Sequence, residues 1–234
     1  MDKSRHFKTF SSRITILASL IVIIVLLATL PTLAQGDDEQ TGMFITKRIF
    51  YAGVVGGVNL AQVDGDNFAG YYKVGLNVGG IGYVQIARRV SLSWELLYSQ
   101  KGSKSNAPRL ANDDTTVITK YGIKANYAEI PIMINFFDKY KSHIGFGFSY
   151  NRLVNSSETL QMSPNVPINL NKYPFKPDDW EFVAGAMMKM YKGLFLNLRF
   201  EYSIIPFRDN VPPNFSRASD YNNLWNVRLM YLFM

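Results

Sequence analysis

The stretch that decides the fold is Val-Ser-Leu-Ser-Trp-Glu-Leu-Leu-Tyr-Ser, residues 90–99. Its even-numbered positions are all apolar, and its odd-numbered positions are polar except for Leu97. Successive side chains of a strand point to opposite faces, so this run has one apolar and one polar face. Residues 194–204 resemble it, with Arg199 and Glu201 on the polar face. Such strands suit a wall between lipid and a polar interior.

The beginning of the chain has the pattern of an export signal. A basic segment ending at Arg13 precedes an apolar run, residues 14–30, and a small residue, Ala34, closes the segment. This pattern predicts that residues 1–34 are a signal peptide removed after export. A retained membrane anchor is the alternative, because the apolar run is nearly as long as the roughly 20 residues of a spanning helix.

The remaining chain divides into two parts. Residues 35–48 are predicted to be a polar periplasmic tether, and residues 49–234 an outer-membrane β-barrel domain. No stretch after the signal approaches the length of a spanning helix, which excludes a helical membrane protein. A soluble β-sandwich could also alternate in polarity, but it would leave the export signal unexplained.

The composition excludes several function classes. The chain has no cysteine, which excludes disulfides, thiolate metal sites and the lipid-bearing cysteine of a lipoprotein. The formal net charge is +7, and removal of the predicted signal lowers it to +4. This mild excess is spread over loops of mixed sign, so we expect no nucleic-acid partner.

The alternation recurs along the chain and predicts eight strands. Their expected ranges are 51–63, 71–86, 90–99, 117–137, 143–154, 180–191, 194–204 and 225–233. Short turns alternate with long loops, which are residues 64–70, 102–116, 155–179 and 206–223. Short periplasmic turns and long external loops are typical of outer-membrane barrels. The predicted fold class is therefore all-β, an eight-stranded antiparallel up-and-down transmembrane β-barrel with both termini in the periplasm.

The strand at 117–137 is less regular than the others. Tyr121 and Ile123 are apolar residues at odd-numbered positions, whereas in the second half of the strand the polar residues are at odd-numbered positions. A β-bulge near Asn126 would explain the change. The alternative is that this part of the strand stands clear of the membrane.

Three segments carry a resemblance to a known family. They are Trp-Glu-Leu-Leu-Tyr-Ser-Gln-Lys-Gly at 94–102, Tyr-Ala-Glu-Ile-Pro at 127–131 and Leu-Met-Tyr-Leu-Phe at 229–233. With them, nearly the whole mature chain resembles the PorT-like outer-membrane β-barrel family of Bacteroidetes. The resemblance implies an eight-stranded barrel whose terminal aromatic strand is read by the outer-membrane assembly machinery. Here Met234 follows the terminal Phe233, a small departure from that signal.

No catalytic, cofactor or metal site is predicted. Outside the predicted signal the sole histidine is His143, which follows a short turn and is expected to be a solvated residue at the periplasmic rim. The segment Asp-Gly-Asp-Asn at 64–67 lacks the later ligands of a calcium loop. We therefore expect a protein that is not an enzyme and needs no cofactor.

Charged residues on the lumen side of the strands are more informative. They are Lys73, Glu95, Glu129, Glu181, Lys189, Arg199, Glu201 and Arg228. An eight-stranded barrel is just wide enough for side chains to fill, and an unpaired buried charge is costly. We expect Arg199 and Arg228 to bridge three carboxylates as a closed plug. Those carboxylates are Glu95, Glu129 and Glu201. A narrow ion pathway is the alternative.

These observations predict a non-enzymatic outer-membrane barrel with a charge-filled lumen. Its external loops are the candidate interaction surface, with Tyr173 and Phe175 of the longest loop as contact residues. The expected partners are outer-membrane lipid and the assembly machinery, and the sequence names no specific protein partner. Two alternatives are open. One is a small porin, and the other, suggested by one PorT-like member, is an accessory role in a protein secretion system.

Overall fold

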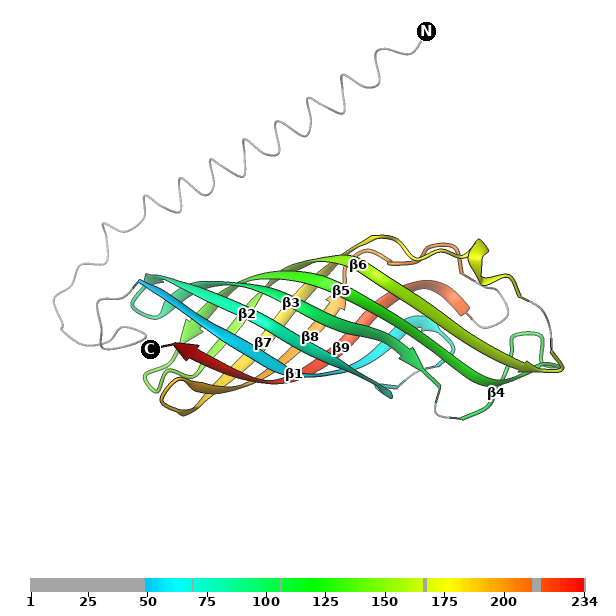
Figure 1. Cartoon of the computed structure of the whole chain (residues 1–234), viewed down its shortest axis with the longest axis horizontal. Coiled ribbons are helices and arrows are strands. Elements are labelled where there is room, and N and C mark those ends of the chain that lie inside the picture. Colours follow the sequence, from blue (N-terminus) through cyan, green and yellow to red (C-terminus); the bar gives the residue numbers. More distant parts are fainter. Residues whose placement is uncertain (1–48, 69, 106, 166–167, 212–215, 234) are drawn as a thin grey trace, which may run out of the picture. The chain divides into compact units, whose positions relative to one another are not determined.

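The computed structural model describes residues 49–233, except for 69, 106, 166–167 and 212–215 (Figure 1). The predicted signal peptide and tether therefore lie outside the described residues. Within the described part, no helix is long and apolar enough to cross a membrane.

Antiparallel strands make up most of the described chain. They are β1 (Phe50–Asp66), β2 (Lys73–Ala87), β3 (Val90–Lys104), β4 (Arg109–Leu110), β5 (Val117–Phe137), β6 (His143–Ser163), β7 (Asp178–Tyr191), β8 (Leu194–Ser203) and β9 (Ser216–Phe233). A short 3-10 turn, η2 (Leu170–Lys172), precedes β7. Strand β1 pairs with both β2 and β9, and β3 pairs with β5, so eight strands close into a ring with β4 beside it. The predicted eight-stranded antiparallel barrel is confirmed (Figure 1).

Large apolar side chains cover the outer face of the ring. Val74, Leu96 and Ile144 are 60%, 59% and 62% exposed, respectively, and water would disfavour a continuous surface of this kind. Exposed aromatic residues mark both edges of this lipid-facing band. They are Tyr72, Tyr98 and Trp180 towards the long loops, and Phe50, Phe136, Tyr231 and Phe233 towards the short turns. An apolar band flanked by aromatic residues is the outer surface of a membrane barrel.

Strands β5 and β6 continue beyond the lipid-facing band, and there the polarity of the wall inverts. Tyr121 and Ile123 of β5 are buried, whereas Lys120 and Lys124 are exposed. Odd positions face inward along β5 from Tyr121 to Phe137, so the strand keeps its direction and only the chemistry of its two faces changes. An apolar interior with a polar exterior suits a segment surrounded by water. This part therefore stands clear of the lipid, as one of the two alternatives predicts.

The bulge expected near Asn126 lies on the neighbouring strand. Asn126 pairs with Asn155 and Tyr127 pairs with Leu153, so Val154 of β6 is the extra residue. A bulge of this kind bends its strand. Here it accompanies the passage from the lipid-facing band to the water-facing extension.

Several strands are longer than the sequence predicts. Strand β1 continues to Asp66, β3 to Lys104 and β6 to Ser163, and β9 begins at Ser216, so parts of all four predicted long loops are paired backbone. The reason is that residues beyond the band lack an apolar outer face, and the period-two signal of polarity fades there although the hydrogen-bond ladder continues.

Two apolar clusters fill the ends of the lumen. The turn-side cluster consists of Tyr51, Val55, Ile81, Tyr83, Leu97, Phe137, Met187, Phe195, Met230 and Leu232. The loop-side cluster consists of Val63, Phe68, Ala111, Ile118, Tyr121, Ile123, Ala125, Tyr127 and Phe207. Charged and amide side chains lie between them, so the charged layer is enclosed at both ends.

Candidate functional site: a buried charge network

One half of the charged layer is built on a carboxylate of β3. Glu95 accepts hydrogen bonds from the guanidinium groups of Arg199 on β8 and Arg228 on β9, with Nη1 to Oε2 distances of 3.2 and 2.9 Å. Arg199 makes a second contact through its Nη2, so its pairing with Glu95 is bidentate. Arg228 also donates to the amide oxygens of Asn77 and Asn197, at 3.0 and 2.9 Å. Two arginines from adjacent strands thus bind one carboxylate on the opposite wall.

The other half is built on an ammonium group. Lys101 of β3 places its Nζ 2.5 Å from Glu181, 3.5 Å from Glu129 and 3.5 Å from Glu201. All four side chains are 0% exposed. Glu201 also lies 3.7 Å from Arg199, which joins the two halves into one network.

The structure brings together all five residues that the sequence predicts for the lumen, and one of them, Glu129, has a different partner from the one predicted. Arg199 and Arg228 converge on Glu95. Glu129 forms an ion pair with Lys101, so a lysine replaces the predicted arginine bridge to this carboxylate. Of the other predicted lumen charges, Glu181 joins the network. Lys73 and Lys189 stay partly exposed near strand ends.

Three carboxylates of the network have the spacing of a metal site. One oxygen each from Glu129, Glu181 and Glu201 lies within 4.8 Å of the others. The ammonium of Lys101 is within 3.5 Å of the same three groups, so it takes the place that a cation would occupy. The donor set therefore fits internal neutralisation by the chain's own lysine better than a resident metal.

Comparison with known proteins assigns the chain to a family. Residues 34–209 match the family model described as an outer membrane protein beta-barrel domain. The chain belongs to this outer-membrane barrel family. No curated protein matches the chain.

Several solved outer-membrane barrels are similar to this one at low identity. The attachment invasion locus protein Ail of Yersinia pestis is 10% identical, with 80% of this chain and 100% of Ail covered and a TM-score of 0.42. Neisserial surface protein A is 9% identical, with 80% and 98% covered and a TM-score of 0.42. OprG from Pseudomonas aeruginosa is 10% identical, with 79% and 94% covered and a TM-score of 0.37.

Towards the loops, this outer-membrane barrel has a second buried ion-paired group. Arg208 is 0% exposed and donates to Asp220 at 2.6 Å through Nε and to Glu158 at 2.9 Å through Nη1. These residues come from the loop after β8, from β9 and from β6. The pairing therefore ties a connecting loop to two strands of the extension.

The longest loop packs partly against its own barrel. The ring of Phe175 stacks on Phe207, with 5.6 Å between centroids, and the guanidinium of Arg208 lies 4.7 Å from the Phe175 centroid. Phe175 is only partly exposed, as is Tyr173. Of the two predicted contact residues, Phe175 has much of its ring occupied by contacts within the chain.

His143 does not lie in solvent at the periplasmic rim, so that prediction is wrong. It is 4% exposed, its ring stacks on Phe137 at 4.1 Å, and its Nε2 lies 3.2 Å from the hydroxyl of Tyr83. The ring is part of the turn-side packing because its parity places it inside the barrel.

Proposed function

We propose that this outer-membrane barrel is a closed, non-enzymatic scaffold that does not conduct solutes and acts through its loop-side extension. The observation that carries the proposal is the burial of the lumen. Glu95, Arg199 and Arg228 are 0–1% exposed, as are Lys101 and its carboxylate partners. A side chain with no accessible surface has no water-sized space beside it, and a porin needs a water-filled interior.

The orientation is part of the proposal. The short connections, residues 88–89, 138–142 and 192–193, lie at the end where β9 finishes, and the long loops and the extension lie at the other end. In outer-membrane barrels the short turns are periplasmic. The chain would then have both termini in the periplasm and its extension outside the cell.

The partners follow from the same arrangement. Outer-membrane lipid would cover the apolar band, and the assembly machinery would read the terminal strand that ends in Tyr231 and Phe233. The resemblance to PorT-like barrels of Bacteroidetes leaves an accessory role in secretion as the alternative function. Such a role would require a stable partner complex, which a pull-down from detergent-solubilised outer membrane would reveal.

The test is conductance together with stability. The purified protein in a planar bilayer should show little steady current, and Arg228→Ala should lower the unfolding temperature without opening a conductance. Large, stable single-channel currents from the unmutated protein would overturn the proposal. A porin would be favoured further if Arg228→Ala changed ion selectivity and left the unfolding temperature unaltered.

A further inference from the structure

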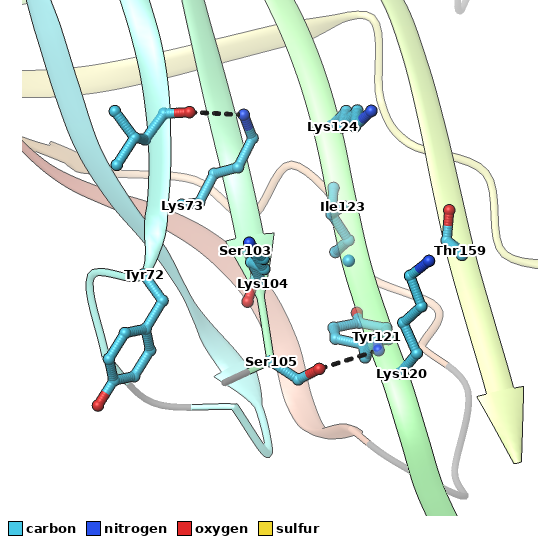
Figure 2. Close-up of a pocket in the computed structure, with 12 residues that line it drawn as sticks. Tyr72, Lys73, Ser103, Lys104, Ser105, Lys120, Tyr121, Ile123, Lys124 and Thr159 are labelled. Carbon is cyan, nitrogen blue, oxygen red and sulfur yellow. Dashed lines mark hydrogen bonds between the residues drawn. The ribbon is translucent and has the colours of Figure 1, made fainter. Parts of the chain in front are cut away.

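A notch of about 480 Å³ lies in the barrel wall directly beyond the lipid-facing band (Figure 2). Residues of β2, β3, β5 and β6 line it. Four lysines are among them, namely Lys73, Lys104, Lys120 and Lys124. Figure 2 shows these lysines on three neighbouring strands around the notch, with the ring of Tyr72 at its edge. The notch is therefore strongly basic.

The notch follows from unequal strand pairing. The ladder between β2 and β3 ends at Asn77 and Ser99, whereas β3 stays paired with β5 as far as Lys104 and Gly122. Beyond Ser99 the β2-facing edge of β3 is thus outside that ladder. The lysines of β3 and β5 come to lie beside this step in the wall.

The positive charge of the notch is not neutralised by carboxylates. Among the ion pairs between described residues, none includes a lysine of the notch. Lys73 donates to the backbone oxygen of Val74 at 3.0 Å, and the charges of Lys124 and Lys104 both repel it. The carboxylate of Glu158 on β6 is bound to Arg208 instead. An anion bound here would relieve this repulsion.

The surroundings of the notch indicate which anion fits. On the side of the short turns, the wall exposes apolar groups, including Val74 at 60%, Trp94 at 52% and Leu96 at 59%. Tyr72 and Tyr98, at 48% and 38%, stand at the edge of this surface, where aromatic residues meet the lipid headgroups. An occupant with both acyl chains and a negative headgroup would contact the apolar wall and the lysines together.

We propose that the notch binds the phosphate groups of an anionic lipid in the leaflet on the loop side, with the acyl chains of the lipid against the wall of β2 and β3. Lysine ammonium groups bind phosphate as point charges, and basic clusters at a membrane surface recognise anionic headgroups. The identity of that leaflet as the external one rests on the proposed orientation. The proposed lipid contact itself does not depend on that orientation.

The experiment measures lipid selectivity by native mass spectrometry. The purified protein is released from micelles that contain equal amounts of a diphosphorylated glucosamine lipid and phosphatidylcholine. The unmutated protein should retain the phosphorylated lipid preferentially. Lys104→Gln combined with Lys124→Gln should weaken this binding roughly twenty-five-fold, because each lysine removed near an anionic surface accounts for about fivefold. The matched control is Lys139→Gln with Lys192→Gln, which makes the same charge change at the short turns.

Three results would overturn the proposal. The first is equal retention of the two lipids by the unmutated protein, and the second is an equal loss of binding in the control variant. The third is displacement of the lipid by inorganic pyrophosphate at matching concentration, which would assign the notch to a free anion. Heat-modifiable gel mobility establishes that each variant is folded, and Lys104→Arg with Lys124→Arg should keep the lipid because the charge is retained.

Orientation is tested separately. Since the chain has no cysteine, the exposed Ser157 can be changed to cysteine and labelled on whole cells with a membrane-impermeant maleimide. Labelling only after the outer membrane is opened would refute the orientation in the proposed function. The lipid selectivity measured in micelles would be unaffected by that result.

Discussion

Replacement of Lys101 by methionine should destabilise the barrel more than any single surface change. The substitution preserves most of the side-chain volume but leaves three carboxylates, at 2.5, 3.5 and 3.5 Å from the ammonium, without their shared counter-ion. Removing one partner of a buried ion pair lowers the free energy of unfolding by roughly 3–5 kcal/mol. Glu201 keeps a contact with Arg199 at 3.7 Å, but within the described part of the chain Glu129 and Glu181 have no other ion pair.

The assay is urea unfolding in detergent micelles, followed by tryptophan fluorescence and by heat-modifiable mobility. Trp94, Trp180 and Trp225 are 52%, 47% and 39% exposed on the lipid face, so their emission should change when the barrel opens.

Lys104→Met is the matched control for Lys101→Met. It removes the same charge from an exposed position on the same strand and should change the free energy of unfolding little. Adding Glu181→Gln to Lys101→Met should recover stability, with a coupling of about 1–3 kcal/mol. Equal stability of the Lys101 and Lys104 variants would refute the argument that the lysine neutralises the lumen.

Three further changes test other parts of the structure. Burial raises the pKa of Asp66, in the water-facing extension, from 3.8 to about 6. Because the folded state then binds the proton more tightly, this group adds stability at low pH that is lost as the pH rises through about 6. Hydrogen exchange of the extension, measured over this pH range in the unmutated protein and in Asp66→Asn, should show the loss of stability. Leu198→Arg, on the lipid face at 46% exposure, should cost roughly 2–4 kcal/mol in urea unfolding, whereas tolerance equal to that of Leu198→Phe would contradict the assigned face. Arg208→Met should loosen the loop that holds Phe175, which would appear as faster proteolysis of that loop while heat-modifiable mobility is retained.

The sequence predicts the lipid-facing part of the barrel well because two environments act on each strand there. Lipid selects apolar residues on one face, and a narrow lumen selects small or charged residues on the other, so the period of two is strong. Residues 117–137 are predicted as one strand, and β5 has these bounds. The closing of eight strands into a ring is predicted from this alternation together with the export signal and the alternating short and long connections.

The charge network is harder to predict because it depends on the length of one strand. The predicted strand at 90–99 ends before Lys101, yet the inward parity of Glu95 and Ser99 continues to Lys101. Gly102, with a φ of 126°, resembles the start of a loop in sequence. The partners of Lys101 lie on β5, β7 and β8, and periodicity along one strand carries no information about such distant contacts.

His143 and Phe175 show a different limit. Each follows a turn or lies in a loop, where sequence alone suggests solvent, but each packs onto aromatic residues that are distant in sequence. The ring of His143 lies 6.0 Å from that of Phe195 in β8, besides its stack on Phe137. Burial of such residues depends on the closure of the ring, which brings the strand ends together.

The network also gives a physical reason for the register of the strands. Lys101 binds carboxylates of three other strands, and Glu95 binds arginines of two. A shift of one residue in any of these strands turns its charged side chain outward. In the lipid-facing band an outward charge would contact hydrocarbon, and its partner inside the barrel would be unpaired. The shift is therefore energetically costly on both faces of the wall. Apolar alternation alone opposes it only from the lipid side. We therefore expect that replacing Lys101 and its three carboxylate partners by apolar residues would keep a barrel but populate more than one strand register. Cysteine cross-links between β3 and β5 would detect the mixed registers. A single register in that variant would show that the wall alone selects the pairing.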